Sequence, residues 1–303
     1  MHRPIRFGIQ GGPLDDPVAL AEHARRIEAL GYDEFFTMDH FGGQSVDPFM
    51  PLMTVAAATT RLRVGPLVIN NEFHHPALLA RTAISVDQLS AGRLTLGLGT
   101  GYARAEHDAI GLELRDPGPR VDRFGESLFV LRELLDEGAC QMAGTHHVVD
   151  VDGLLPPVQE HVPFLIGGHG RRVVELAGRF ADIFQFTGLE HTEDGTLQPA
   201  GFRVDHLDLR AQWLEDAAGS RNAEIERSAL VQMCVVGDGA PTDAEVADRY
   251  RFDPIDVADC PFVLTGSIEQ IVDKLGRLRE RLGITHWVIR EPEAFAPVLD
   301  ALG

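Results

Sequence analysis

Segments typical of strands and of helices alternate along the whole 303-residue chain, with no break in composition. Short runs rich in apolar and β-branched residues indicate strands, and apolar residues three and four positions apart indicate helices. We predict strands over residues 6–10, 34–38, 63–69, 94–99, 162–166, 181–186, 229–236 and 286–289. The first predicted helix begins at Pro17. Further helices are predicted over residues 48–60, 76–89, 120–137, 171–180, 206–218 and 267–282. Eight such units predict an α/β fold, a (β/α)8 TIM barrel that occupies residues 1–303 as one domain.

The alternative architecture is a doubly wound open sheet. That fold usually has fewer strands, and its nucleotide-binding signature G-x-G-x-x-G is missing, because Tyr102 stands where the third glycine would be. Two polar stretches rich in glycine and proline, residues 188–203 and 237–261, interrupt the alternation. We expect them to be long loops inserted at the C-terminal mouth of the barrel, where such loops often form lids.

Composition restricts the partners and the compartment. The formal net charge of −19 argues against nucleic acid or an anionic membrane surface as a partner. No apolar run approaches the roughly 20 residues that a membrane span needs. Cys140, Cys234 and Cys260 are odd in number and widely spaced, which fits the reduced cytoplasm. The neighbouring His74 and His75 would point in different directions, so no metal site is expected.

Residues 87–101 are predicted to form the end of a helix, a tight stop and a strand. Gly92 would end the helix in the left-handed conformation, which glycine adopts at little cost. In the strand that follows, leucines at 94, 96 and 98 alternate with Thr95, Gly97 and Gly99. One face therefore suits packing under helices, and the other is almost bare of side chains, so that a flat ligand could lie there.

Polar residues follow several predicted strands, and active sites of TIM barrels lie at the C-terminal strand ends. Asp39 and His40 follow the second strand. His40 suits proton transfer near neutral pH, and Asp39 suits either orienting it or capping a loop. Asn70 ends the third strand as an amide partner for a heterocycle or as a turn residue. Tyr102 and Glu106 follow the fourth strand, Tyr102 as a proton donor or stacking partner and Glu106 as a further polar candidate or as a plain helix-face residue.

A glycine-rich turn follows the fifth strand. Gly167 and Gly168 precede a helix that begins at Arg171, and the free backbone N–H groups of such a helix start suit a phosphate. Arg171 and Arg172 add positive charge to an acidic chain, so we favour a phosphate site over a tight turn with solvated arginines. The chain has no G-x-S-x-G, H-E-x-x-H or P-loop motif, so hydrolase, zincin and NTPase functions lack support.

Several of these motifs resemble those of one known family. The run LSAGRLTLGLGTG, from Leu89 to Gly101, resembles the signature of the luciferase-like monooxygenase superfamily. Further matching pieces occur in the same order, at Gly31-Tyr32-Asp33, Asp39-His40-Phe41, Phe73-His74-His75-Pro76-Ala77, Ile166-Gly167-Gly168, Ala181-Asp182 and Thr265-Gly266-Ser267. The resemblance implies a bacterial luciferase-like TIM barrel that binds FMN or the deazaflavin coenzyme F420. It also implies a homodimer.

The resemblance is closer to the F420-dependent branch, and it implies roles for particular residues. It places His40 beside the deazaflavin, and it implies a non-proline cis peptide bond between Leu67 and Val68 that supports the ring. It matches Gly167 and Gly168 to the backbone that meets the phosphate end of the coenzyme. Together with the strand-end residues above, the expected catalytic residues are His40 and Tyr102, and the expected cofactor-binding residues are Asp39, Leu67, Val68, Asn70, Gly99, Thr100, Gly101, Gly167, Gly168 and Arg171.

The chain departs from the F420-dependent sugar-phosphate dehydrogenases on the substrate side. Tyr102 stands where those enzymes have a glutamate acid, and Gln44 stands where they have a tryptophan. Their lysines for the substrate phosphate are not all present, because Lys274 is the only lysine. A sugar phosphate is therefore not expected as the substrate.

The resemblance predicts an F420-dependent oxidoreductase that transfers a hydride between C5 of the deazaflavin and a small organic substrate. His40 or Tyr102 would handle the accompanying proton. Because a neutral tyrosine is a better donor than acceptor at pH 7, we favour reduction of the substrate by reduced F420. The alternatives are an FMN-dependent monooxygenase that uses reduced flavin and O2, and a non-catalytic member that has kept only the barrel.

Overall fold

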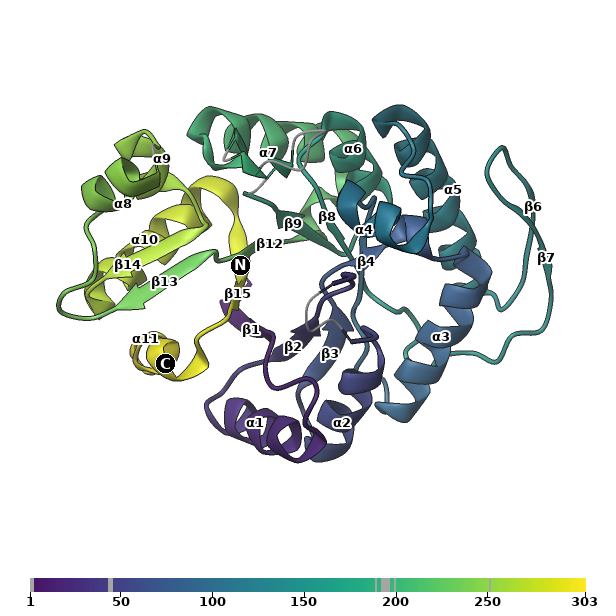
Figure 1. The fold of residues 1–303 in the computed structure, drawn as a ribbon, viewed down its shortest axis with the longest axis horizontal. Coiled ribbons are helices and arrows are strands. Elements are labelled where there is room, and N and C mark those ends of the chain that lie inside the picture. Colours follow the sequence, from purple (N-terminus) through teal and green to yellow (C-terminus); the bar gives the residue numbers. More distant parts are fainter. Residues whose placement is uncertain (1–2, 43–45, 189, 192–196, 199, 251) are drawn as a thin grey trace.

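The computed structural model describes residues 3–42, 46–188, 190–191, 197–198, 200–250 and 252–303 (Figure 1). Its centre is a parallel sheet that curls into a barrel, with its strand segments in the order β3-β2-β1-β15-β12-β9-β8-β5-β4. The bounds of these segments are β1 (Arg6–Gln10), β2 (Glu34–Thr37), β3 (Arg63–Pro66), β4 (Ile69–Asn70), β5 (Leu96–Gly99), β8 (Phe164–Gly167), β9 (Ile183–Phe186), β12 (Glu226–Leu230) and β15 (Ile284–Ile289).

The barrel closes between the two ends of that order. β3 and β4 are parts of one stretch of chain, and a bridge between Val64 and Leu94 joins β3 to the residues just before β5. There the N–H of Thr95 donates to the carbonyl of Val64 at 2.9 Å. With β3 and β4 taken as one strand the barrel has eight strands, so the predicted (β/α)8 TIM barrel is confirmed.

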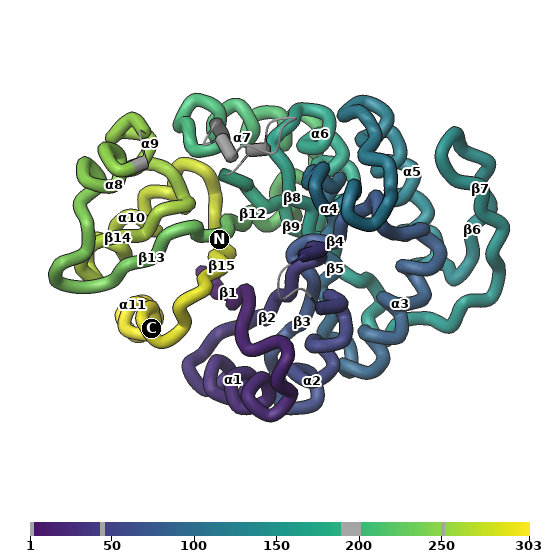
Figure 2. The backbone as a smooth tube through the Cα atoms, in the orientation of Figure 1, coloured from purple at the N-terminus to yellow at the C-terminus, as the bar shows by residue number. Residues whose placement is uncertain are grey.

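Helices cover the outside of the barrel, and the first and last strands, β1 and β15, are neighbours (Figure 2). Asp16 caps the first helix by accepting from Val18 N, and Ser267 forms a capping box with Gln270 at the start of α10. The helices are α1 (Pro17–Ala29), α2 (Met50–Ala58), α3 (Pro76–Leu89), α4 (Arg104–Ile110), α5 (Pro117–Asp136), α6 (Arg171–Phe180), α7 (Val204–Ala218), α8 (Asp243–Tyr250), α9 (Pro254–Asp259), α10 (Ile268–Leu282) and α11 (Pro292–Leu302).

The third strand is interrupted between β3 and β4, and glycines of β5 make room for it. The peptide bond between Leu67 and Val68 is cis, as the resemblance implies. A Cβ atom on Gly97 would lie 2.0 Å from the carbonyl oxygen of Pro66, and one on Gly99 would lie 2.6 Å from Cγ2 of Val68. The bare face of this strand therefore receives the neighbouring strand. The expectation that a flat ligand lies directly against these two glycines is wrong, because protein atoms already fill that space.

The additions to the barrel differ from the prediction. The strand predicted over residues 229–236 is divided, because β12 ends at Leu230 and the chain then leaves the barrel as β13 (Met233–Val236), which pairs with β14 (Val263–Gly266). Residues 229–236 form one continuous, largely apolar run, so periodicity does not show where β12 ends and β13 begins. The loop expected over residues 237–261 contains α8 and α9. A hairpin of β6 (Cys140–Ala143) and β7 (Val148–Val151), which we did not predict, projects at one edge of the molecule (Figure 1).

The other expected loop, over residues 188–203, is described only in part. Its described residues include β10 (Glu190–His191), β11 (Leu197–Gln198) and the 3₁₀ helix Ala200–Phe202, whereas residues 189, 192–196 and 199 lie outside the described part of the chain. The side chain of Arg210, buried in α7, donates to the carbonyl oxygens of Thr187 at 2.6 Å and Gly201 at 2.5 Å. These two hydrogen bonds tie both ends of the segment to the outer helix layer.

Charged groups occupy the N-terminal end of the barrel. Arg6 lies 2.9 Å from the fully buried carboxylate of Glu34 and 2.7 Å from that of Glu226. Nε2 of the buried His286 lies 3.7 Å from Glu34, and burial together with the charge of Arg6 holds the pKa of His286 well below its usual value. In barrels of this kind that end serves stability, so we look for the functional site at the opposite end.

We expect the substitution Gly97→Ala to lower the free energy of unfolding by at least about 2 kcal/mol, because the new methyl group would overlap the carbonyl of Pro66. The matched control is Gly276→Ala in the middle of α10, where a Cβ meets no atom within 4 Å. That variant should gain roughly 0.5–1 kcal/mol from helix propensity. Urea unfolding followed by circular dichroism measures both, and equal stability of Gly97→Ala and the wild type would contradict the close approach.

Candidate active site

The C-terminal ends of neighbouring strands bring the predicted site residues to one level. The register pairs Asn70 of β4 with Gly99 of β5, and it pairs Leu98 of β5 with Ile166 of β8. The residues that follow Leu98 on β5 and Ile166 on β8 are Gly99 and Gly167. These two glycines therefore lie at the same end of adjacent strands. The mouth of the barrel therefore gathers residues that are far apart in the sequence.

A histidine, a glutamate and a tyrosine meet at this mouth. Nδ1 of His40, which follows β2, lies 2.8 Å from Oε1 of Glu106 in the first turn of α4. The other oxygen of Glu106 accepts from the backbone N–H of Phe41 at 3.3 Å. On the far side of the imidazole, the hydroxyl of Tyr102 lies 3.5 Å from Nε2 of His40. An ionised carboxylate only accepts hydrogen bonds, so Glu106 directs the Nδ1 proton of His40 toward itself and leaves Nε2 facing Tyr102.

The environment of Tyr102 keeps its hydroxyl protonated. Partial burial raises the pKa of Tyr102, and the negative charge of Glu106 raises it further. The side chain nevertheless remains 45% exposed, and that of His40 remains 40% exposed. Both rings are therefore accessible at the mouth, and the protonated hydroxyl of Tyr102 can donate a hydrogen bond there at neutral pH.

Asp39 and Asn70 direct their polar atoms into the protein. Oδ2 of the buried Asp39 accepts from the backbone N–H of Asn70 at 2.9 Å and lies 2.9 Å from Nε2 of His74. The Asn70 side chain accepts from Glu72 N at 3.0 Å and lies 3.2 Å from Nε2 of His107. These contacts fix the turn that follows the third strand.

Asn70 also explains the glycine that follows Thr100. Gly101 has a φ of +77°, and a Cβ there would lie 2.0 Å from Oδ1 of Asn70. The exit from β5 therefore passes directly over the Asn70 amide. Thr100 Oγ1 makes only a long contact of 3.5 Å, to the carbonyl of Gly101.

A second polar group at the mouth involves the third strand. The amide of the buried Gln10, at the end of β1, donates to the carbonyl of Leu67 at 2.9 Å. Its oxygen accepts from Nη2 of Arg290 at 2.9 Å and from Nε at 3.1 Å. Nη1 of Arg290 donates to the side-chain oxygen of Gln232 at 3.1 Å. Leu67 is buried and Val68 is partly exposed, so Val68 is the residue of this cis pair that faces the opening.

The turn after β8 agrees with the prediction only in part. Gly167 has room for a side chain, whereas a Cβ on Gly168 would lie 2.5 Å from Cγ1 of Val173, so packing against α6 requires a glycine there. The N-cap residue of α6 is Gly170, which has no side chain to cap the helix, so within the described part of the chain backbone donors are available there. Nε of Arg171 lies 2.8 Å from Oε1 of Glu175 on the exposed surface, and Arg172 pairs with Asp122. The charges of both arginines are thus already met by carboxylates.

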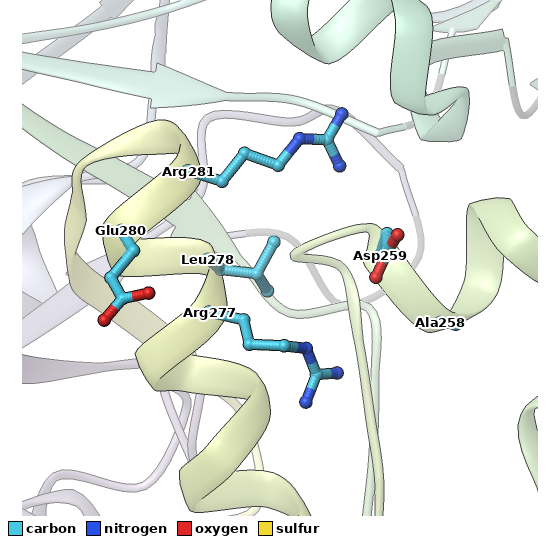
Figure 3. Close-up of a pocket in the computed structure, with 6 residues that line it drawn as sticks. All are labelled: Ala258, Asp259, Arg277, Leu278, Glu280 and Arg281. Carbon is cyan, nitrogen blue, oxygen red and sulfur yellow. The ribbon is translucent and has the colours of Figure 1, made fainter.

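A pocket on the outside of the barrel lies between α9 and α10 (Figure 3). Arg277 and Arg281 extend from α10 across it, and Arg281 lies 2.6 Å from Oδ2 of Asp208. Its lining residues are Ala258, Asp259, Arg277, Leu278, Glu280 and Arg281. None of them belongs to the strand-end residues described above, so we place the candidate site at the barrel mouth. Within the described residues no helix is long and apolar enough to cross a bilayer, and no three metal-ligating side chains come together.

The sequence profile of the luciferase-like monooxygenase family matches residues 4–235. The chain belongs to this family. It is 24% identical to an F420-dependent glucose-6-phosphate dehydrogenase of Microbacterium testaceum, over 95% of this chain and 92% of that enzyme. It is 29% identical to the 4-hydroxyprotoasukamycin monooxygenase of Streptomyces nodosus subsp. asukaensis, over 68% of this chain and 55% of that enzyme. Proteins similar to this chain thus carry different activities in their names.

The solved structures support the same fold. The F420-dependent tetrahydromethanopterin reductase of Methanopyrus kandleri superposes with a TM-score of 0.75 at 19% identity, over 98% of this chain and 97% of that one. At this identity the likeness concerns the barrel alone. The reaction of this family member therefore depends on the residues at its own barrel mouth.

Three residues of the mouth, Glu106, Gln10 and Arg290, were not among the site residues predicted from the sequence. Of the two alternatives for Glu106, the plain helix-face residue is wrong, because the first turn of α4 points the side chain back toward His40. Gln10 and Arg290 were not predicted, although both stand at the ends of predicted strands. The strand-end rule that selected His40 and Asn70 would also have selected them. Gln44 lies outside the described residues.

The hydrogen bond from His40 to Glu106 has a spectroscopic consequence. With His40 neutral, we expect the imidazole proton on Nδ1 in the wild type. In Glu106→Gln the amide can accept or donate, so the Nε2–H form should become the major one. The exposed Asp108 on the same helix supplies the control, Asp108→Asn, which should leave the tautomer unchanged. The ¹⁵N shifts of the two ring nitrogens report the tautomer, and an Nε2–H form in the wild type would contradict the assignment.

Proposed function

We propose that this protein is an F420-dependent oxidoreductase that transfers a hydride between the deazaflavin and a small organic substrate, in the direction of substrate reduction. The observation that carries the proposal is the group formed by His40, Glu106 and Tyr102 at the mouth of a luciferase-like barrel. An F420-dependent dehydrogenase that aligns with 95% of this chain supports the choice of coenzyme.

The residues of the mouth fit a deazaflavin. Val68 presents a partly exposed apolar side chain at the opening, and the start of α6 has backbone donors that no side chain caps. Val68 and His40 are the residues that would hold the ring, and Gly167 would hold the phosphate end. When bound, F420 supplies a carbon that gives or takes a hydride as a two-electron step. We propose that the coenzyme binds beside the predicted set of residues, which are Asp39, Leu67, Val68, Asn70, Gly99, Thr100, Gly101, Gly167, Gly168 and Arg171.

The chain's own residues would manage the proton. Glu106 fixes the His40 ring and favours the form with the proton on Nδ1. Tyr102, held protonated by partial burial and by the charge of Glu106, gives its proton to the substrate as the hydride arrives. Nε2 of the exposed His40, which carries no proton in this form, then takes up a proton from the solvent and passes it to the tyrosine oxygen across the 3.5 Å contact. His40 and Tyr102 are in this account the catalytic residues, and Glu106 is a positioning residue.

A sugar phosphate does not suit this site as the substrate. The only lysine of the chain, Lys274, is buried in α10, where its Nζ donates to the carbonyl of Val257 at 2.7 Å. Burial lowers the pKa of Lys274, which also makes it a poor anchor for a phosphate. We therefore propose that the substrate is not a sugar phosphate, unlike the glucose 6-phosphate in the name of the Microbacterium relative.

The second candidate is an FMN-dependent monooxygenase. The relationship to 4-hydroxyprotoasukamycin monooxygenase supports it, since that enzyme shares the family with this chain. We also infer a homodimer in the cytoplasm. The resemblance supports the dimer, and exposed leucines on α3 such as Leu78 and Leu89 offer apolar surface to bury. The three cysteines are free, which is compatible with a reducing compartment.

Binding titrations with F420 and with FMN, read by cofactor fluorescence, test the choice of coenzyme. We expect F420 to bind at least about tenfold more tightly than FMN, a difference of about 1.4 kcal/mol. Selective FMN binding together with oxygen consumption by the reduced flavin would instead establish the monooxygenase. Binding of neither would establish a member that has kept the fold alone.

The substitution His40→Ala should leave folding intact and lower turnover by a factor on the order of 10² or more, because the proton path through Tyr102 is broken. The measurement is kcat on the first substrate found in a screen with reduced and oxidised F420. The exposed His206 on α7 supplies the control, and His206→Ala should retain wild-type kcat. Full activity in His40→Ala would remove this histidine from the mechanism.

A further inference from the structure

Arg290 stands at the barrel mouth with neutral partners only. It follows β15 directly, its guanidinium is exposed, and the side-chain oxygens of Gln10 and Gln232 accept three of its five N–H groups. Among the described residues no carboxylate oxygen lies within 4.0 Å of its nitrogens. The two amides fix the plane of the guanidinium without neutralising its charge.

This arrangement contrasts with that of several other exposed arginines of this acidic protein. Arg171, Arg203 and Arg281 are paired with carboxylates, at 2.8 Å, 2.7 Å and 2.6 Å respectively. Partial withdrawal from water lowers the pKa of Arg290, and the charge of Glu291 opposes that change. A guanidinium still stays charged at neutral pH. An oriented, uncompensated cation with two donors left over matches a carboxylate, which takes up two N–H groups side by side.

The position of Arg290 separates it from the expected coenzyme phosphate. In the closed sheet β15 lies between β1 and β12, whereas β8 and its Gly167 are separated from it by β12 and β9. Only β1 separates β15 from β2, which leads to His40. Gln10 also links Arg290 to the carbonyl of Leu67, next to the partly exposed Val68. The cation thus faces the opening from the rim near His40.

Apolar side chains at the mouth complete a site for an amphipathic molecule. Met38 is 38% exposed and Phe41 is 49% exposed, and both follow β2. The ring of Phe41 packs against that of Phe73 edge to face, with 5.3 Å between the centroids. These side chains offer an apolar surface on the same side of the barrel as the guanidinium.

We propose that Arg290, held by Gln10 and Gln232, binds the carboxylate of the substrate, and that the substrate class is small carboxylic acids with an apolar body. The assignment rests on the proposed function, since it names the substrate of the same site. It predicts that the protein distinguishes an acid from its neutral amide whether or not the coenzyme is bound.

Calorimetric titration with benzoate and with benzamide, on the protein with and without F420, tests this assignment. We expect the wild type to bind benzoate at least about tenfold more tightly than benzamide, and Arg290→Gln to abolish the preference. Gln232→Glu should also abolish the preference for benzoate. The new carboxylate would pair with the guanidinium of Arg290 and leave the cation itself in place. Arg277→Gln removes one charge on the outer surface, away from the mouth, and should keep the preference.

Arg290→Lys guards against misfolding of the glutamine variant, because it keeps the charge and should keep part of the preference. Equal binding of benzoate and benzamide to the wild type, or a preference that survives Arg290→Gln, overturns the proposal. A tenfold loss of F420 affinity in Arg290→Gln also overturns it, because the cation would then serve the coenzyme. If F420 does not bind while the benzoate preference depends on Arg290, the carboxylate site stands and the proposed function fails.

Discussion

The close approach of the third strand to β5 is the constraint on which the rest of this structure depends. Gly97 and Gly99 leave no side chain between the strands, so the carbonyl of Pro66 and the side chain of Val68 occupy that space. The same approach closes the barrel through Val64 and brings Val68 to the opening. A larger residue at either glycine would separate the strands, and both barrel closure and the shape of the mouth would change together.

The charges at the mouth are distributed over two groups with different roles. Glu106 is an acid placed in the first turn of α4, where the helix dipole favours it, and it orients His40. Arg290 is a cation whose partners are amides, so its charge stays available. Buried ion pairs lie at both ends of the barrel, around Arg6 at the N-terminal end and between Glu72 and Arg123 just after β4. These pairs hold the two ends of the barrel, whereas the amide-bound Arg290 keeps its charge available for the proposed carboxylate.

Membership of the luciferase-like family leaves the chemistry open, because the relatives that this chain matches include F420-dependent enzymes and a monooxygenase. In the proposed function, three residues of this chain bear on the choice of substrate. Tyr102 occupies the exit of β5, Lys274 is withdrawn into α10, and Arg290 projects at the rim. A shared barrel can thus keep the coenzyme environment while single residues at strand ends choose the substrate.

The alternation of strands and helices and the strand-end rule were sufficient to predict the barrel, the mouth, and the positions of His40 and Tyr102, because they depend on local periodicity and chain order. The resemblance added the cis bond before Val68. The partners of these residues were decided only by tertiary structure. The contact of Glu106 with His40 and that of Gln10 with Arg290 join residues 66 and 280 positions apart. The pairing of β13 with β14 outside the barrel could not be predicted either, because the hydrophobic pattern of a strand does not specify which sheet the strand joins.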